Sequence, residues 1–178
     1  MDVKKIEKAV SLFLEGLGED PRREGLVKTP QRVAEMCREI FGGLATTPEL
    51  QPAFSEKLGE DDAIEVRGIR FYSVCEHHLL PFFGKIDILY VPGNNRVAGF
   101  SDLLALVDGF ARRPQIQERL TAQIADAVFQ QLSPRAVVVV ARATHLCMAM
   151  RGAHKREAQA VTRAVRGEHY LARISNFK

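Results

Sequence analysis

The segment Arg135–Gly152, with the sequence RAVVVVARATHLCMAMRG, contains the strongest indication of the fold. Its four consecutive β-branched residues, Val137–Val140, are typical of a strand buried on both faces of a sheet. If the extended conformation continues, the alternation of side chains places His145, Cys147 and Arg151 on one face. A thiol that can bind a metal, a titratable imidazole and a guanidinium would then lie on the same face of the strand. This arrangement predicts a functional site at the end of the strand.

A second cluster of the same residue types lies earlier in the chain, at Cys75-Glu76-His77-His78. The chain has three cysteines and five histidines, yet two of the cysteines and three of the histidines fall in these two clusters. Thiolate and imidazole are ligands that zinc prefers, and one tight turn can aim Cys75 and His78 at a common point. Cys147 is the natural third ligand, which would leave one position open for water, as in catalytic zinc sites.

Other interpretations of these clusters remain open. If His145 joined the three other donors, the site would be closed and structural. A disulfide between Cys75 and Cys147 is less favoured, because nothing in the sequence indicates an oxidising compartment. The third cysteine, Cys37, falls in the apolar stripe of an expected helix, and we interpret it as a buried core thiol.

The composition is that of an ordinary globular domain. The chain has 178 residues, 46% of them hydrophobic and 26% charged, which is enough for a single core. The net charge of +3 without a long basic run suits an anionic small molecule and does not indicate a nucleic-acid partner. The N-terminus lacks the apolar segment of a signal peptide, and no stretch has the length of a membrane span. We therefore expect a cytoplasmic protein with no membrane or nucleic-acid partner.

The pattern along the chain predicts two N-terminal helices, then two strands, two helices and two strands. We divide the chain into an N-terminal helical region with a linker, residues 1–62, and a core, residues 63–178. The alternation slips by one near Gly68, which predicts a bulge. Two strand pairs around two long helices indicate an α+β fold with one antiparallel sheet and both helices on one face. The elements are expected at residues 4–16 and 30–41 (helices), 63–74 and 84–91 (strands), 101–113 and 115–132 (helices), and 135–143 and 156–166 (strands).

Three segments resemble the GTP cyclohydrolase I family: FYSVCEHHLLPF at residues 71–82, QIQERL at 115–120 and THLCMAMRG at 144–152. TPQRV at residues 29–33 is also similar. The resemblance implies the tunnelling fold, in which an antiparallel four-stranded sheet of ββααββ order, backed by two helices, joins its neighbours into a barrel. It also implies a homo-oligomer, a decamer of two stacked pentamers, with active sites between subunits.

The same resemblance implies the chemistry of the site. Cys75, His78 and Cys147 would bind Zn²⁺, which would activate water for attack on C8 of the guanine of GTP. His77 and His145 would move protons on and off the ring nitrogens. The reaction would release formate and, after rearrangement, give 7,8-dihydroneopterin triphosphate, a first step towards tetrahydrofolate and other pterins.

Four further residues are implied in binding the substrate. Glu118, with Gln117 beside it, would grip the guanine edge, where a carboxylate can accept two N–H donors. Arg151 would contact the phosphates. Ser101, which we also expect to cap a helix, would take part in the nucleotide site.

Two positions depart from the family pattern. The family usually has Lys where this chain has Asp102 and Arg where it has Ala105, both associated with the triphosphate. At about 4 Å and an effective dielectric of about 20, each such contact is on the order of 4 kcal/mol before desolvation and screening. Two alternatives to GTP hydrolysis are therefore an enzyme for a different purine nucleotide or nucleoside and a non-catalytic oligomer with structural zinc.

Overall fold

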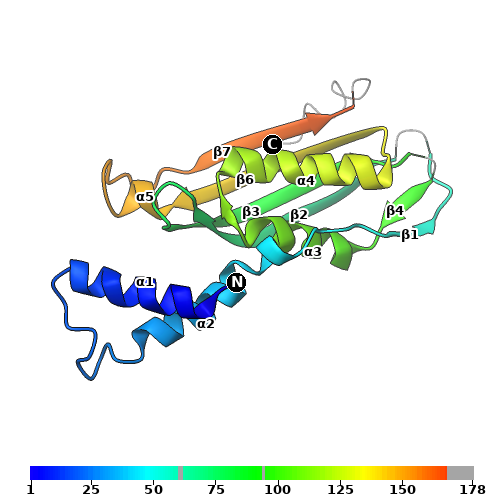
Figure 1. Cartoon of the computed structure of the whole chain (residues 1–178). Coiled ribbons are helices and arrows are strands. Elements are labelled where there is room, and N and C mark those ends of the chain that lie inside the picture. The colour runs from blue at the N-terminus through cyan, green and yellow to red at the C-terminus, as the bar shows by residue number, and fades with distance from the viewer. Residues whose placement is uncertain (60–61, 94, 168–178) are drawn as a thin grey trace. The chain divides into compact units, whose positions relative to one another are not determined.

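The computed structural model describes residues 1–59, 62–93 and 95–167, and the chain divides into two units, Met1–Gly42 and Gly43–Lys178. The first unit contains the two expected helices, α1 (Val3–Gly16) and α2 (Thr29–Ile40), drawn in blue in Figure 1. The Asp2 carboxylate caps α1 by accepting a hydrogen bond from the backbone N–H of Lys5. Cys37 of α2 is half-buried, less than expected, and burial raises the pKa of its thiol.

The second unit is built on a five-stranded sheet in the order β5-β2-β3-β6-β7. All pairs of neighbours are antiparallel except β2 and β5, which are parallel. The four expected antiparallel strands are confirmed, and the short β5 is an addition that the expectation of a four-stranded sheet lacked. The strands are β2 (Ile64–Cys75), β3 (Pro81–Val91), β5 (Pro114–Gln115), β6 (Ala136–His145) and β7 (Ala160–Arg166).

The two edges of this sheet are incompletely paired. Within the described residues, β7 has no strand on its outer side, and β5 covers only Val74 and Cys75 of β2. Residues 168–178, which we assigned to the same core, lie outside the described residues. No helix in the described part of the chain has the length and apolar character needed to cross a membrane.

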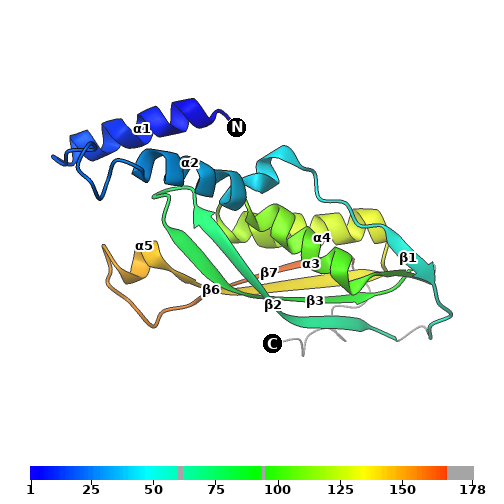
Figure 2. The ribbon, with the colours of Figure 1, turned by 90° about the horizontal axis from the view of Figure 1, so that it is seen from below.

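Two helices, α3 (Phe100–Ala111) and α4 (Gln117–Leu132), cover one face of the sheet, as Figure 2 shows. Side-chain alternation directs Phe71 and Ile86 to this face, where they are buried in the same core cluster as Leu120 and Ile124 of α4. This shared core confirms the α+β class with both long helices on one face. It also fixes the first turn of α4 beside the sheet.

The valine run lies in the middle of β6, between β3 and β7. Val138 and Val139 point to opposite faces, yet both are buried. The prediction of a strand covered on both faces is therefore confirmed.

The bulge expected near Gly68 is also present. The register between β2 and β3 shifts between Val66 and Ile69, and Gly68 has a φ of +72°. This left-handed conformation costs glycine little, because it has no Cβ. The carboxylate of Asp87 on β3 accepts a hydrogen bond from the Gly68 N–H at 2.7 Å, which holds the bulge in place.

The linker expected between the second N-terminal helix and residue 63 contains regular structure. A 3₁₀ helix (Gly42–Ala45) is followed by β1 (Pro52–Ser55). β1 pairs antiparallel with β4 (Arg96–Ala98) in a separate two-stranded sheet. Its partner lies far along the chain, so the local pattern carried no sign of the pairing.

The strand expected to continue through Arg151 ends at His145. A short helix, α5 (Leu146–Ala149), follows directly. The expectation that His145, Cys147 and Arg151 share one strand face is therefore wrong, because a single helical turn interrupts the alternation. Cys147 lies on that turn, and Arg151 lies in the loop after it.

Candidate active site

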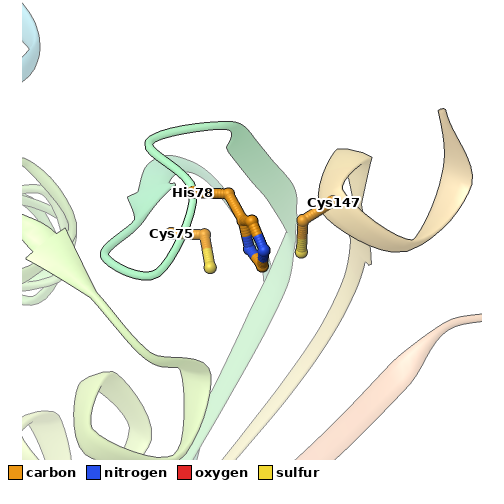
Figure 3. Close-up of side chains that lie close together, drawn as sticks. All are labelled: Cys75, His78 and Cys147. Carbon is orange, nitrogen blue, oxygen red and sulfur yellow. The ribbon is translucent and has the colours of Figure 1, made fainter. Parts of the chain in front are cut away.

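Three side chains from two distant parts of the chain meet at one end of the sheet. The ligand atoms of Cys75, His78 and Cys147 all lie within 4.8 Å of one another. Figure 3 shows Cys75 at the end of β2, His78 in the turn that follows and Cys147 on α5, with the three side chains close together. Cys75 is buried, whereas His78 is exposed, so the group is open to solvent on one side. Both cysteines are free thiols and not a disulfide.

Backbone hydrogen bonds fix the turn between β2 and β3. The Cys75 N–H donates to the Leu80 carbonyl at 2.9 Å, and the Leu79 N–H donates to the Cys75 carbonyl at 2.8 Å. Leu79 adopts a φ of 53°, a left-handed conformation that is uncommon for a residue other than glycine. The tight reversal aims Cys75 and His78 at one point, as their spacing predicted.

The donor set fits a zinc ion. Two soft thiol sulfurs and one imidazole nitrogen are ligands that zinc prefers. Burial raises the pKa of the Cys147 thiol, the neighbouring Cys75 raises it further, and Arg151 lowers it in part. A divalent cation would relieve the repulsion between two thiolates at this spacing. Arg151 also donates a hydrogen bond to Nε2 of His78 at 2.9 Å, which places this guanidinium at the group.

His145, the last residue of β6, lies near this group without belonging to it. The metal-ligand group found among the described residues has three members, so the closed four-ligand site is not formed. The His145 ring stacks on Phe82, with centroids 4.6 Å apart and planes at 4°. Burial lowers the pKa of His145, and the carboxylate of Glu118 raises it in part. The imidazole is therefore neutral near pH 7, the form that can accept a proton.

Gln117, the first residue of α4, is buried at 2% exposure. Its Oε1 lies 2.8 Å from Nε2 of His145, and its Nε2 donates to the carbonyls of Ala141 and Ala160 at 3.0 Å each. The carboxamide that we expected at the guanine edge thus faces the protein interior.

Two other predicted residues face solvent. Glu118 is exposed, and among the described residues its carboxylate has no hydrogen bond or ion pair. His77 is exposed in the turn, with its Nε2 4.0 Å from a carboxylate oxygen of Glu76. Both side chains are accessible to a ligand from outside.

The sequence-based reasoning missed an ion pair that holds the turn. Arg119 of α4 donates to the Glu76 carboxylate at 2.5 Å, and the Glu76 N–H donates to the Gln115 carbonyl at 3.0 Å. Phe82, which stacks on His145, was also missed. The position of Glu76 inside the histidine cluster was a usable signal, whereas nothing distinguished Phe82 from other core aromatics.

Ser101 lies at the opposite end of the sheet from Cys75 of the same chain. β3 leads away from the metal group to Val91, and α3 returns the chain to Gln115, which pairs with Cys75. A helix of 12 residues spans about 18 Å, and Ser101 is in its first turn. The site of one chain therefore does not include its own Ser101.

The two departures from the family pattern lie on the same helix. Asp102 is in the first turn of α3, where a carboxylate interacts favourably with the helix dipole. Ala105 follows one turn later and is exposed. The N-cap of α3 is Gly99 without a side-chain hydrogen bond, so the expected cap by Ser101 is wrong.

Comparison with known proteins gives a consistent result. The family model described as GTP cyclohydrolase I matches residues 6–173. A GTP cyclohydrolase 1 of Desulforamulus reducens is 55% identical over 168 residues, which is 93% of this chain and 89% of that protein. One of Carboxydothermus hydrogenoformans is 51% identical over 169 residues, covering 94% and 87%. One of Bifidobacterium longum is 51% identical over 168 residues, covering 93% and 83%.

A solved structure has a related fold. The crystal structure of the archaeosine synthase QueF-Like in the apo form matches with a TM-score of 0.50 and covers 63% of this chain and 98% of that one. The sequence identity is 18%, so this likeness concerns the fold alone.

Proposed function

Because the chain belongs to the GTP cyclohydrolase I family, we propose that it hydrolyses GTP at C8 of the guanine ring. The products are formate and, after rearrangement, 7,8-dihydroneopterin triphosphate. The observation that carries the proposal is the meeting of Cys75, His78 and Cys147 within 4.8 Å. Rare ligand types from two remote segments converge in a group that is open to solvent on one side, as a catalytic metal site requires.

We propose Zn²⁺ as the cofactor, held by Cys75, His78 and Cys147. Two sulfurs and one nitrogen suit this ion, and three protein ligands leave a position open for water. When bound, zinc supplies the Lewis-acid chemistry that activates water for attack on C8.

Two histidines in different environments would handle the protons. His145 is half-buried and neutral, so it can accept a proton during the reaction. His77 is exposed in the turn, with its Nε2 4.0 Å from a Glu76 carboxylate oxygen, so its ring can reach a bound ligand. Two rings with different surroundings suit opposite steps of one proton-transfer sequence.

The exposed polar groups would bind the nucleotide. The exposed Glu118 carboxylate, which has no hydrogen bond or ion pair among the described residues, can accept the N1–H and 2-amino donors of guanine. Arg151, beside His78, can pair with a phosphate.

We also propose that assembly completes the site. Ser101 is remote from Cys75 in its own chain, so it can reach a site only in a neighbouring copy. Within the described part of the chain, β7 and most of β2 have an unpaired outer side, which supports joining of sheets from several chains, as in a tunnelling-fold barrel. The decamer of two pentamers remains the expected form of this assembly.

A second candidate substrate is a purine nucleotide with fewer phosphates, or a nucleoside. Asp102 and Ala105 favour it, since neither supplies a cation for a triphosphate. This candidate uses the same metal group and the same histidines.

Zinc content and product assays separate these candidates. The protein and a Cys147→Ala control are analysed for zinc and then assayed for formate and pterin fluorescence with GTP, GDP, GMP and guanosine. We expect about one zinc per chain and both products from GTP. Formate from another purine alone would support the second candidate. Bound zinc without any turnover would overturn both.

A further inference from the structure

We infer that Gln117 is a positioning residue for His145 and not a substrate ligand: its carboxamide holds the imidazole in a single tautomer. The inference rests on the proposed function, because the tautomer matters only if His145 moves a proton. It changes the expected role of Gln117 at the guanine edge.

Three hydrogen bonds determine how the Gln117 carboxamide is oriented. Its Nε2 lies 3.0 Å from the carbonyl oxygens of both Ala141 and Ala160. Carbonyl oxygens only accept, so the NH₂ end must face them and Oε1 must face His145. The reversed amide would set its oxygen against two acceptors in a buried place, which loses both hydrogen bonds.

The orientation of the amide in turn locates the proton on His145. Oε1 of Gln117 carries no hydrogen, so Nε2 of His145, 2.8 Å away, must carry the proton and donate it. The other ring nitrogen, Nδ1, then has the lone pair, and it has no hydrogen-bond partner among the described residues. Stacking on Phe82 fixes the plane of the ring. Nδ1 is therefore the nitrogen that is ready to accept a proton.

The anchors of Gln117 belong to the sheet. Ala141 is in the central strand β6, and Ala160 begins the neighbouring β7. Both amide hydrogens of Gln117 are used, and the side chain is 2% exposed. A purine outside would therefore meet Glu118, the next residue of the helix, and not the amide.

Thr121 provides a matched control one turn later on α4. Its Oγ1 donates to the backbone carbonyl of Gln117 at 2.7 Å and lies 2.6 Å from Oγ1 of Thr162 on β7. It is buried at 1% exposure. Thr121→Val thus removes a buried link between α4 and β7 without changing any group that touches His145.

Steady-state kinetics test the role of the amide. Gln117→Met keeps the length of the side chain and removes its polar atoms. We expect kcat to fall by on the order of 10²–10⁴-fold, the range that proton transfer by a positioned side chain contributes, with KM changed by less than about threefold. Thr121→Val should keep kcat within about threefold of the wild type. A raised KM with unchanged kcat in Gln117→Met would overturn the inference, because that result marks a lost substrate contact.

Nitrogen NMR of protein labelled with ¹⁵N-histidine tests the tautomer without turnover. The His145 signals are assigned by their loss in His145→Gln. We expect a protonated Nε2 and an unprotonated Nδ1 in the wild type and in Thr121→Val, and a mixture of tautomers in Gln117→Met. An unchanged tautomer in Gln117→Met would overturn the inference. If the wild type turns over no purine, the proposed function fails, while this spectrum still decides how Gln117 acts on His145.

Discussion

The two histidines proposed to move protons are held in opposite ways. His145 is the last residue of the central strand β6, stacks on Phe82 and is hydrogen-bonded to the buried carboxamide of Gln117. His77 lies in an exposed turn, near the carboxylate of Glu76. The strand end gives one ring a defined position and tautomer, whereas the turn gives the other ring access to solvent and ligand.

The metal group shows the same division. Cys75 is buried at the end of β2, and His78 is exposed three residues later in the turn. The site is thus assembled where a well-packed sheet meets a short exposed segment. The following substitutions test this contrast between the end of the sheet and the exposed turn. The first removes Cys147, the proposed zinc ligand that completes the group with Cys75 and His78.

Cys147→Ala should have the largest effect, because it removes one of three proposed zinc ligands. We expect the loss of bound zinc and a fall in turnover of more than about 10⁴-fold, beyond the roughly 10²–10⁴-fold of a lost proton-transfer group, because water activation is lost with the ion. Metal analysis and the formate assay measure both. Cys37→Ala is the matched control and should retain zinc, because Cys37 lies outside the metal group. Full zinc in Cys147→Ala would contradict the ligand assignment.

Replacing each histidine should separate catalysis from stability. Both His145→Ala and His77→Ala should lower turnover by on the order of 10²–10⁴-fold. Only His145→Ala should also lower the free energy of unfolding, by about 1–3 kcal/mol, because it leaves the buried oxygen of Gln117 without a donor. For His77→Ala we expect a change within about 0.5 kcal/mol. Urea denaturation measures the difference, and equal losses would remove the contrast between the two regions.

The lowered pKa of His145 predicts a pH dependence of stability. Burial favours the neutral ring in the folded protein, so the unfolded chain binds the proton first as the pH falls. The contribution of the neutral His145 ring to the free energy of unfolding is complete above the ordinary histidine pKa of about 6.5. This contribution is lost as the pH falls from that value towards the lower pKa of the folded protein. Urea denaturation between about pH 7.5 and 5.5 should show this decline, and His145→Gln should lack that component. His77→Gln should keep it.

Arg119→Met should have the smallest effect. The pair that it breaks with Glu76 is 40% and 33% exposed, so we expect a loss of about 0.2–1 kcal/mol that shrinks in high salt. Denaturation at low and high ionic strength measures it. A larger loss that is independent of salt would show that the turn is held as firmly as the strand end.

Residue types and strand periodicity predicted much of this arrangement. The run Val137–Val140 indicated the buried central strand, because strands with one face in solvent usually alternate apolar and polar residues. Cys75, His78 and Cys147 were found because cysteine and histidine are rare in this chain and seldom cluster without a cause. The resemblance to a family then added Glu118 and Arg151, whose types alone are common on any surface.

Features that depend on remote backbone partners could not be predicted. The alternation of residues 145–151 fits a continued strand as well as a single helical turn, so α5 was missed. A glutamine at the start of a helix is usually exposed, and nothing in the sequence marks the carbonyls of Ala141 and Ala160 as its partners. β5 was missed because a strand of two residues is too short to show an alternation of side chains in the sequence.

The incompletely paired sheet edges have a consequence for how the protein is made. Within the described residues, the outer side of β7 and most of the outer side of β2 present backbone donors and acceptors that can pair with another extended chain. Sister chains and unrelated unfolded polypeptides therefore compete for the same groups. Early encounter with sister chains therefore protects these groups from mispairing with other unfolded polypeptides.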